Sequence, residues 1–292
     1  MLGTYAKHSH RDHLAAHPNG NVRGICGERR LAGACVSGLP SDANTNRENF
    51  GSGLTVNSRW VKVKLAIFCD FDETITRTNV TDGVLERFAD PHWLEIQEHW
   101  LAGKLSAREV LEYQMPLVTV TPEDLDAFIN SIEIDPLFAE FALSCAQKND
   151  SLYILSDGFD YWIDRILRRA LSAYNGMVKK IPVFACGLSV KDNRLDISFP
   201  YFPQGCTHGC ATCKPAIFNK LKPSAEKTIV IGDGVSDLIL AKDADLVLAK
   251  DGLREFCQRK GILNQEYNDF SDVIRIISAF REKTFEDNIG DT

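Results

Sequence analysis

The chain has 292 residues, of which 44% are hydrophobic and 25% are charged, so it is long enough to bury a full core and a second, smaller one. Its formal net charge of −7 argues against a nucleic-acid-binding protein, and no basic patch with interleaved aromatic residues is evident. No apolar stretch approaches the roughly 20 residues that cross a bilayer, and no secretory signal is recognisable, so we expect a cytoplasmic protein that binds neither membranes nor nucleic acids.

The first sixty residues differ in composition from the rest of the chain. They contain His8, His10, His13 and His17, and seven Lys or Arg against four Asp or Glu. Because no apolar face recurs in this stretch, we predict a disordered leader over residues 1–60. A transit peptide and an upstream extension from an early start codon are alternatives, and a His cluster is also able to bind metal.

Two aspartates, Asp70 and Asp72, follow an apolar run over residues 65–69. Such a run suits a buried parallel strand, so the residues after it emerge at the edge where open α/β sheets bind their ligands. There, one carboxylate can attack as a nucleophile while its neighbour transfers protons, because like charges separate their two pKa values. Taken alone, the pattern is equally consistent with an acidic loop after a strand.

Residues 78–149 change to a helical rhythm. We predict a helical bundle inserted between the first strand and the next, which would act as a cap that closes over substrate and excludes water. The expected helices, several of which begin with proline or after an N-cap residue, are 80–89, 93–103, 107–113, 122–131 and 136–147.

Residues in this cap are candidates for substrate specificity, because a cap faces the ligand. For the aromatic candidates, packing within the helices is the alternative role. The candidates are Asn79, Asp82, Trp93, Trp100 and Tyr113.

Strand and helix patterns alternate after the cap. The alternation predicts an α/β fold with a doubly wound parallel-sheet (Rossmann-like) core, formed by residues 61–77 and 150–282, and with an inserted helical-bundle cap. The expected strands are 151–155, 228–231 and 245–248, and the expected helices are 159–171, 235–241 and 253–259. A hairpin is expected over 183–190 and 194–199, a last helix over 270–280, and a frayed tail over 283–292.

Three later segments supply further polar groups. Ser156 and Gly158 follow a strand-like run and offer a hydroxyl and a close backbone approach to an anion. Lys214 stands at a helix start, where a cation offsets phosphoryl charge, and Asp233 and Asp237 lie on a tight turn whose oxygen ligands suit Mg²⁺. Each has a structural alternative, namely a helix cap, a surface charge or an ordinary turn, but together they favour a phosphate-handling site.

In these segments the chain resembles the haloacid dehalogenase superfamily of phosphatases, in the branch related to phosphoserine phosphatase. The resemblance covers about residues 61–279, and its signatures are Asp70-Phe71-Asp72-Glu73-Thr74, Ser156, Lys214 and Gly232-Asp233-Gly234-Val235-Ser236-Asp237. Within that branch, residues 68–72 and 210–215 are most similar to the methionine-salvage subgroup that acts on 2-hydroxy-3-keto-5-methylthiopentenyl-1-phosphate. A phosphocholine and phosphoethanolamine phosphatase group is a close relative.

The resemblance implies a Mg²⁺-dependent phosphomonoesterase that acts on a small phosphorylated metabolite through an aspartyl-phosphate. In that scheme, Asp70 is the nucleophile, Asp72 is the acid and base, and Lys214 balances the phosphoryl charge. The implied Mg²⁺ ligands are Asp70, the Asp72 backbone carbonyl and Asp233, with Asp237 nearby. The implied phosphate- and substrate-binding residues are Thr74, Ser156, Gly158 and Asn79.

Two positions depart from the relatives. Glu73 stands where relatives often carry a small residue, so a third carboxylate lies near the metal loop. Asn79 aligns with a glutamate that holds the substrate amino group in phosphoserine phosphatases. A neutral amide does not supply that ion pair, so phosphoserine ranks behind the methionine-salvage ester as the expected substrate.

Nine cysteines, an odd number without an export signal, argue against a disulfide framework. Cys206, Cys210 and Cys213, with His208 between them, form a cluster that is able to hold Zn²⁺. A redox pair of thiols and a loop of small residues that positions Lys214 are the alternatives.

Two other functions stay open at this level. The first is a phosphotransferase that passes the phosphoryl group to an alcohol instead of water. The second is a non-catalytic metal- or ligand-binding protein centred on the cysteine loop. Neither the alcohol that leaves nor the oligomeric state follows from the sequence.

Overall fold

The computed structural model describes residues 63–174, 176, 181–206 and 209–290. The leader predicted over residues 1–60 lies outside these residues, so its predicted disorder stays a prediction. Among the residues described, no helix combines the length and the apolar character that crossing a membrane requires.

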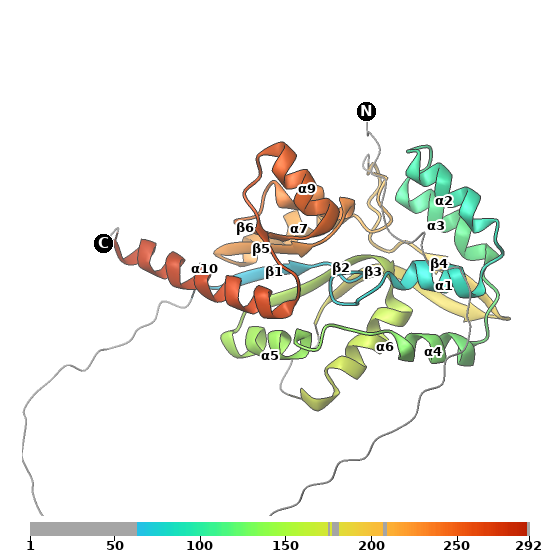
Figure 1. The fold of residues 1–292 in the computed structure, drawn as a ribbon, viewed down its shortest axis with the longest axis horizontal. Coiled ribbons are helices and arrows are strands. Elements are labelled where there is room, and N and C mark those ends of the chain that lie inside the picture. Colours follow the sequence, from blue (N-terminus) through green and yellow to red (C-terminus); the bar gives the residue numbers. More distant parts are fainter. Residues whose placement is uncertain (1–62, 175, 177–180, 207–208, 291–292) are drawn as a thin grey trace, which may run out of the picture. The chain divides into compact units, whose positions relative to one another are not determined.

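A seven-stranded sheet lies at the centre of the described part of the chain (Figure 1). Its strand order is β4-β3-β2-β1-β5-β6-β7, and all neighbouring strands pair in parallel except β3 and β4. The strands are β1 (Leu65–Cys69), β2 (Ser151–Phe159), β3 (Val183–Lys191), β4 (Arg194–Ser198), β5 (Lys227–Gly232), β6 (Leu246–Ala249) and β7 (Gln265–Glu266). The predicted α/β class is confirmed.

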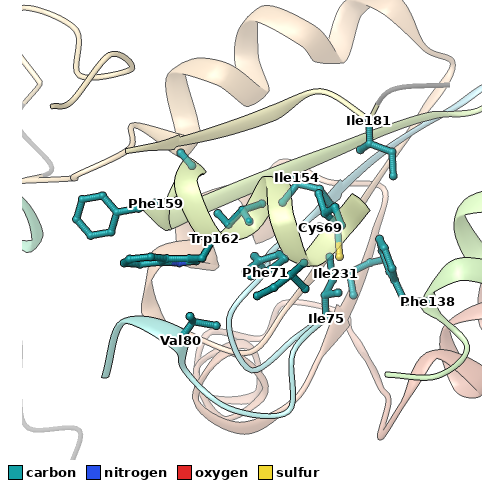
Figure 2. Packing of buried hydrophobic residues seen from close by; sticks show 14 of the residues in the cluster. Cys69, Phe71, Ile75, Val80, Phe138, Ile154, Phe159, Trp162, Ile181 and Ile231 are labelled. Carbon is teal, nitrogen blue, oxygen red and sulfur yellow. The ribbon is translucent and has the colours of Figure 1, made fainter. Parts of the chain in front are cut away.

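Helices cover both faces of this sheet, as a doubly wound fold requires. Alternate residues of β1 point to opposite faces: Leu65 and Ile67 join the core cluster that includes α5 (Phe138–Lys148), whereas Ala66 and Phe68 join the cluster that includes α7 (Lys214–Leu221). Figure 2 shows the first of these clusters, in which aromatic and aliphatic side chains from several elements meet. The remaining helices around the sheet are α6 (Asp160–Ala170), α8 (Leu238–Ala241), α9 (Asp251–Lys260) and α10 (Phe270–Gly290).

The register of the central strands places their ends at one edge. Cys69, the last residue of β1, pairs with Ile154 in β2 and with Ile231 in β5. The residues that follow these three positions therefore emerge side by side. This alignment brings the polar segments after β1, in the last part of β2 and after β5 to a common edge of the sheet.

Five helices occupy the segment between β1 and β2, close to the predicted positions. Asn79, Ser106 and Thr121 accept backbone hydrogen bonds as N-caps of three of them, and Ser106 forms a capping box with Glu109. The helices are α1 (Val80–Phe88), α2 (Trp93–Leu101), α3 (Ala107–Gln114), α4 (Pro122–Ser131) and α5.

The last of these helices, α5, packs on the sheet rather than with α2 and α3. Its Phe138 and Phe141 rings lie 5.3 and 5.2 Å from the ring of Phe270 at the start of α10. This helix therefore covers the sheet together with α10. The division into a core and a cap over residues 78–149 stays a prediction.

The strands β3 and β4 form the predicted hairpin at one edge of the sheet. Asp192 and Asn193 have φ angles of 48° and 59° in the turn between them, as a two-residue turn with positive φ at both central positions requires. The backbone N–H of Val120 donates to the carbonyl oxygen of Asn193 at 3.0 Å. The hairpin tip thereby contacts the segment that precedes α4.

The predicted end of the last helix at residue 280 is wrong, because α10 extends to Gly290. Residues 283–290, which we expected to fray, are therefore helical. Lys283 and Glu286 in this stretch have high helix propensity. The Arg281 guanidinium also forms an ion pair with buried Asp150, which fixes the middle of the helix to the start of β2.

Candidate active site

A buried lysine lies at the common edge of the central strands. Lys214, at the start of α7, is only 1% exposed, and its Nζ lies 2.9 Å from Asp70 Oδ1, 2.8 Å from Asp237 Oδ1 and 2.8 Å from Ser236 Oγ. Burial alone would lower the pKa of Lys214, but the surrounding carboxylates outweigh burial and raise it. The lysine is therefore a permanent cation between two aspartates that are far apart in the sequence.

Asp70 is held by hydrogen bonds with the backbone of neighbouring residues and by the ion pair with this lysine. Its N–H donates to the carbonyl oxygen of Ile231 at 2.9 Å, and its Oδ1 accepts a hydrogen bond from the N–H of Phe71 at 2.8 Å. Because Oδ1 also contacts Lys214, the orientation of the carboxylate is fixed through one oxygen. The second oxygen, Oδ2, takes part in none of these contacts.

Asp72 has the pKa expected of a group that exchanges protons near neutral pH. Burial raises its pKa from 3.8 to about 7, and the negative charges of Asp70 and Asp82 add to this effect, although a hydrogen bond from Val80 opposes it. Its Oδ1 accepts that bond from the Val80 N–H at 2.8 Å, whereas Oδ2 lies 3.5 Å from Ser156 Oγ. Both protonation states are thus accessible at pH 7, as general acid–base chemistry requires.

Three carboxylates at this edge fit a divalent cation. One oxygen from each of Asp70, Asp233 and Asp237 lies within 4.8 Å of the others. Asp237 Oδ2 is buried and has no hydrogen-bond partner among the described residues, which is costly for an anionic oxygen unless a cation binds it. Hard oxygen ligands of this kind suit Mg²⁺. The Thr74 hydroxyl donates to Asp233 Oδ1 at 3.3 Å and braces the group.

The same carboxylates hold their protons tightly without a cation. Burial raises the pKa of Asp233 to about 8 and that of Asp237 to about 7, and the charge of Asp70 adds to both shifts. Glu73 also contributes to the shift at Asp233, so the third carboxylate near the metal loop does act on this site. A bound divalent cation would reverse these shifts, because it favours the ionised form.

These raised pKa values predict that the metal-free protein loses stability as pH rises. Each folded-state pKa lies above the ordinary carboxyl value of 3.8, so the stabilising contribution is complete below about pH 4 and disappears as pH passes through about 7 to 8. With EDTA present, we expect a lower thermal unfolding midpoint at pH 8 than at pH 5. Mg²⁺ should raise the midpoint more at pH 8.

The control for this experiment is Asp237→Asn, in which both the pH difference and the Mg²⁺ effect should shrink. Differential scanning fluorimetry at the two pH values measures all four conditions for each protein. A metal-free protein that unfolds at a higher temperature at pH 8 than at pH 5 would contradict this assignment of the proton-binding groups.

Ser156 and Gly158 lie in the last part of β2, beside Asp72, because the strand extends to Phe159 and not only to the predicted residue 155. Ser156 is 1% exposed, and its Oγ accepts a hydrogen bond from the N–H of Gly158 at 2.9 Å. A Cβ at Gly158 would lie 2.8 Å from Asp72 Oδ2, 3.1 Å from Ser156 Oγ and 3.4 Å from Trp162 Nε1. Three polar side chains therefore converge on the face of this glycine, where a larger residue does not fit.

Gly158→Ala should therefore impair catalysis more than folding. The new methyl group would displace the Asp72 carboxylate, and a misplacement of about 1 Å costs roughly 100-fold in kcat/KM. Gly252→Ala is the matched control, because its Cβ would meet only the Asp233 carbonyl oxygen, at an ordinary 3.6 Å. Steady-state kinetics of the two variants check the prediction; equal activities would show that the crowding at Gly158 has no consequence.

A family model decides the classification of this chain. The model described as haloacid dehalogenase-like hydrolase matches residues 67–242, which contain every carboxylate discussed above.

The chain belongs to the haloacid dehalogenase-like hydrolases.

Curated relatives of this hydrolase agree with the family. The chain is 31% identical over 217 residues to 2-hydroxy-3-keto-5-methylthiopentenyl-1-phosphate phosphatase of Geobacillus thermodenitrificans (strain NG80-2), which covers 73% of this chain and 96% of the relative. It is 31% identical over 223 residues to the protein of the same name from Brevibacillus brevis (strain 47 / JCM 6285 / NBRC 100599), covering 75% and 98%. The predicted family and the predicted enzyme class, a phosphatase, are confirmed.

Solved structures share the fold of this hydrolase. A substrate-bound phosphoserine phosphatase complex aligns with a TM-score of 0.56 and 21% identity, covering 74% of this chain and 98% of that one. A phosphoserine phosphatase with a phospho-aspartyl intermediate analogue aligns with a TM-score of 0.55 and 22% identity, covering 74% and 99%. At this level of identity the likeness concerns the fold alone.

Several of the predicted specificity residues of this hydrolase contact other parts of the protein. The Asn79 side chain accepts a hydrogen bond from the N–H of Asp82 at 3.0 Å and caps α1, so at least its oxygen is engaged in the helix start. Trp93 is 9% exposed and belongs to the core cluster, and Trp100 packs against that cluster. Tyr113, in contrast, is 56% exposed. Their predicted roles in substrate specificity stay predictions.

Three further residues contact the site of this hydrolase, and the sequence did not indicate their roles. Asp157 accepts a hydrogen bond from the N–H of Thr212 at 2.7 Å, and Ser236 contacts the lysine. Both lie inside the motifs that we recognised, but their roles depend on contacts across the sheet edge. Tyr267 is buried, and its hydroxyl donates to the Gly232 carbonyl oxygen at 3.3 Å; no motif pointed to it.

The cysteine cluster of this hydrolase lies on the loop that leads to α7. The sulfur atoms of Cys206, Cys210 and Cys213 all lie within 4.8 Å of one another. His208, which the sequence placed in the same cluster, lies outside the described residues. Three of the four predicted members are thus close together.

Proposed function

We propose that this hydrolase cleaves a small phosphate monoester with the help of Mg²⁺ and through a phosphorylated Asp70. The observation that carries the proposal is the buried lysine between two aspartates, beside a third aspartate with a pKa of about 7. This set combines a fixed nucleophile, a neutralising cation and a proton carrier. Phosphoryl transfer requires little else from a protein, because its catalysis is mainly positioning and electrostatic stabilisation.

Asp70 would attack phosphorus through Oδ2. The other oxygen of this carboxylate, Oδ1, is held by Lys214 and by the N–H of Phe71. The new oxygen–phosphorus bond forms as the ester oxygen–phosphorus bond breaks, and protonated Asp72 gives its proton to the leaving oxygen. Asp72, now ionised, would then take a proton from water as the water attacks the aspartyl-phosphate. Inorganic phosphate leaves, Asp70 is regenerated, and Asp72 regains its proton.

The other groups would hold charge during both steps. Lys214 neutralises Asp70 and the phosphoryl oxygens, and Ser156 with nearby backbone amides would bind the non-bridging oxygens. Asp70, Asp233 and Asp237 would hold Mg²⁺, which supplies further charge neutralisation when bound. This ion is distinct from the Zn²⁺ that the sequence suggests at the cysteine loop, because the two groups of ligands share no residue.

We propose 2-hydroxy-3-keto-5-methylthiopentenyl-1-phosphate as the substrate, since the curated relatives carry its name. The neutral amide at Asn79 supports this choice over phosphoserine, whose amino group calls for an anionic partner. Phosphocholine and phosphoethanolamine are further candidates with cationic groups. The predicted cytoplasmic location stays a prediction.

A comparison of kcat/KM for these four esters, with purified protein and Mg²⁺, tests the choice. We expect the methionine-salvage ester to be hydrolysed at least about 100-fold better than phosphoserine, because an unpaired ammonium group costs several kcal/mol in a closed site. Equal or better hydrolysis of phosphoserine would overturn the substrate assignment while leaving the mechanism intact.

Product analysis in the presence of a competing alcohol separates hydrolysis from phosphotransfer. We expect inorganic phosphate as the main product over a range of alcohol concentrations. A phosphorylated alcohol that replaces inorganic phosphate would identify a phosphotransferase with the same aspartyl-phosphate chemistry.

A further inference from the structure

We propose that Cys206, Cys210 and Cys213 bind a Zn²⁺ ion at a structural site separate from the Mg²⁺ site. The Sγ atoms of Cys206 and Cys213 lie 3.8 Å apart, and Cys210 Sγ lies within 4.8 Å of both. Two thiolates bound to one tetrahedral Zn²⁺ at about 2.3 Å are roughly 3.8 Å from each other. The sulfur atoms therefore already have the spacing of ligands that share one zinc ion.

The same spacing disfavours the two alternatives for this loop. A disulfide brings its sulfur atoms to about 2 Å, which is well below the separation of Cys206 and Cys213. A loop that only needed small residues would not require three thiols to point toward a common centre. The intervals of three and two residues between the cysteines also suit zinc ligands that come from one short loop.

The backbone around the cluster is held in place on both sides. The N–H of Cys206 donates to the Pro203 carbonyl oxygen at 3.2 Å, and the N–H of Cys213 donates to the Tyr201 carbonyl oxygen at 3.2 Å. Cys213 is 2% exposed, whereas Cys206 and Cys210 are half-buried. A water molecule would complete the tetrahedron as the fourth ligand.

The position of the loop indicates what the metal would do. The Gly209 carbonyl oxygen accepts a hydrogen bond from the N–H of Ala107 at 3.0 Å, at the start of α3. The Thr212 N–H donates to Asp157 at 2.7 Å, in the last part of β2 beside Ser156, and Lys214 follows directly on Cys213. A zinc ion would therefore hold together the helix α3, the end of β2 and the loop that leads to the lysine.

Cobalt substitution tests the site without depending on catalysis. The full chain is stripped of metal under reducing conditions and titrated with Co²⁺ in the presence of Mg²⁺. We expect thiolate-to-cobalt charge-transfer absorption that saturates at one equivalent and is abolished by Zn²⁺. The Asp70, Asp233 and Asp237 group offers only oxygen ligands, so it does not produce this absorption.

A matched pair of variants locates the signal. Cys210→Ser should lose the charge-transfer absorption and the bound zinc, whereas Cys257→Ala, which removes a buried thiol in α9, should keep both. In the wild type we expect about one zinc per chain by elemental analysis. Removal of this zinc in the presence of Mg²⁺ should lower the thermal unfolding midpoint by about 5 °C or more.

Two results would overturn the proposal. One is a reduced, folded wild-type protein that retains no zinc and shows no thiolate absorption with Co²⁺. The other is a disulfide between Cys206 and Cys213 in protein purified without oxidant, detected by differential alkylation. Both readouts concern the thiols alone, so they are independent of whether the phosphatase mechanism proves correct.

Discussion

Asp70→Asn should reduce hydrolysis of any phosphate ester by at least about 10⁴-fold, the effect expected when a covalent nucleophile is lost. An amide in place of the carboxylate is nearly isosteric, but it is a poor nucleophile. It also removes one of the anions that hold Lys214. Folding should survive the change, since the other anion, Asp237, still pairs with the lysine at 2.8 Å.

The control for this variant is Asp196→Asn on the edge strand β4, whose exposed carboxylate pairs with Lys191 at the surface. Its kcat/KM should equal that of the wild type. Steady-state kinetics with thermal unfolding curves measure both variants. Asp70→Asn protein that is folded and retains more than a few per cent of activity would exclude Asp70 as the nucleophile.

Lys214→Ala should damage both stability and activity. The lysine is 1% exposed and contacts two buried aspartates, so its removal leaves negative charge without a partner in the interior. Breaking a buried pair in this way typically costs about 3–5 kcal/mol in the free energy of unfolding, although protonation of Asp237, whose pKa is raised to about 7, offsets part of it at low pH. Activity should fall by about 10³-fold or more.

Lys220→Ala tests whether these losses are specific to the buried cation, because Lys220 lies exposed on the same helix. It should change the free energy of unfolding by less than about 0.5 kcal/mol. Urea unfolding monitored at pH 6 and pH 8 compares the three proteins. If Lys214→Ala is as stable as Lys220→Ala at pH 8, the electrostatic description of the site is wrong.

The sequence predicted the parts of the site that depend on local patterns. Apolar runs ending in Asp70 and Asp233 indicated strands, and parallel strands end at one edge, so the proximity of these carboxylates followed from the fold class alone. The N-caps Ser106 and Thr121 placed two helix starts correctly, because capping is a local interaction.

The rest depends on contacts between segments that are distant in the sequence. Tyr267 reaches the Gly232 carbonyl oxygen from a segment without a motif, and Asp157 is engaged by Thr212 from another loop. The helix α10 was predicted too short, since the ion pair of Arg281 with Asp150 joins residues 131 positions apart. Neither propensity nor spacing contains that information.

The most direct test of the mechanism is to trap the phosphorylated enzyme. With an aryl phosphate as substrate, whose leaving oxygen needs no proton from Asp72, Asp72→Asn should slow mainly the hydrolysis of the intermediate, because no group then activates water. Wild type and this variant are mixed with substrate and Mg²⁺, quenched in acid and digested, and the peptides are analysed by mass spectrometry. We predict one phosphoryl group on Asp70, at higher occupancy in the variant. A phosphoryl group on another residue, or turnover with none on Asp70 in either protein, would contradict the proposed mechanism.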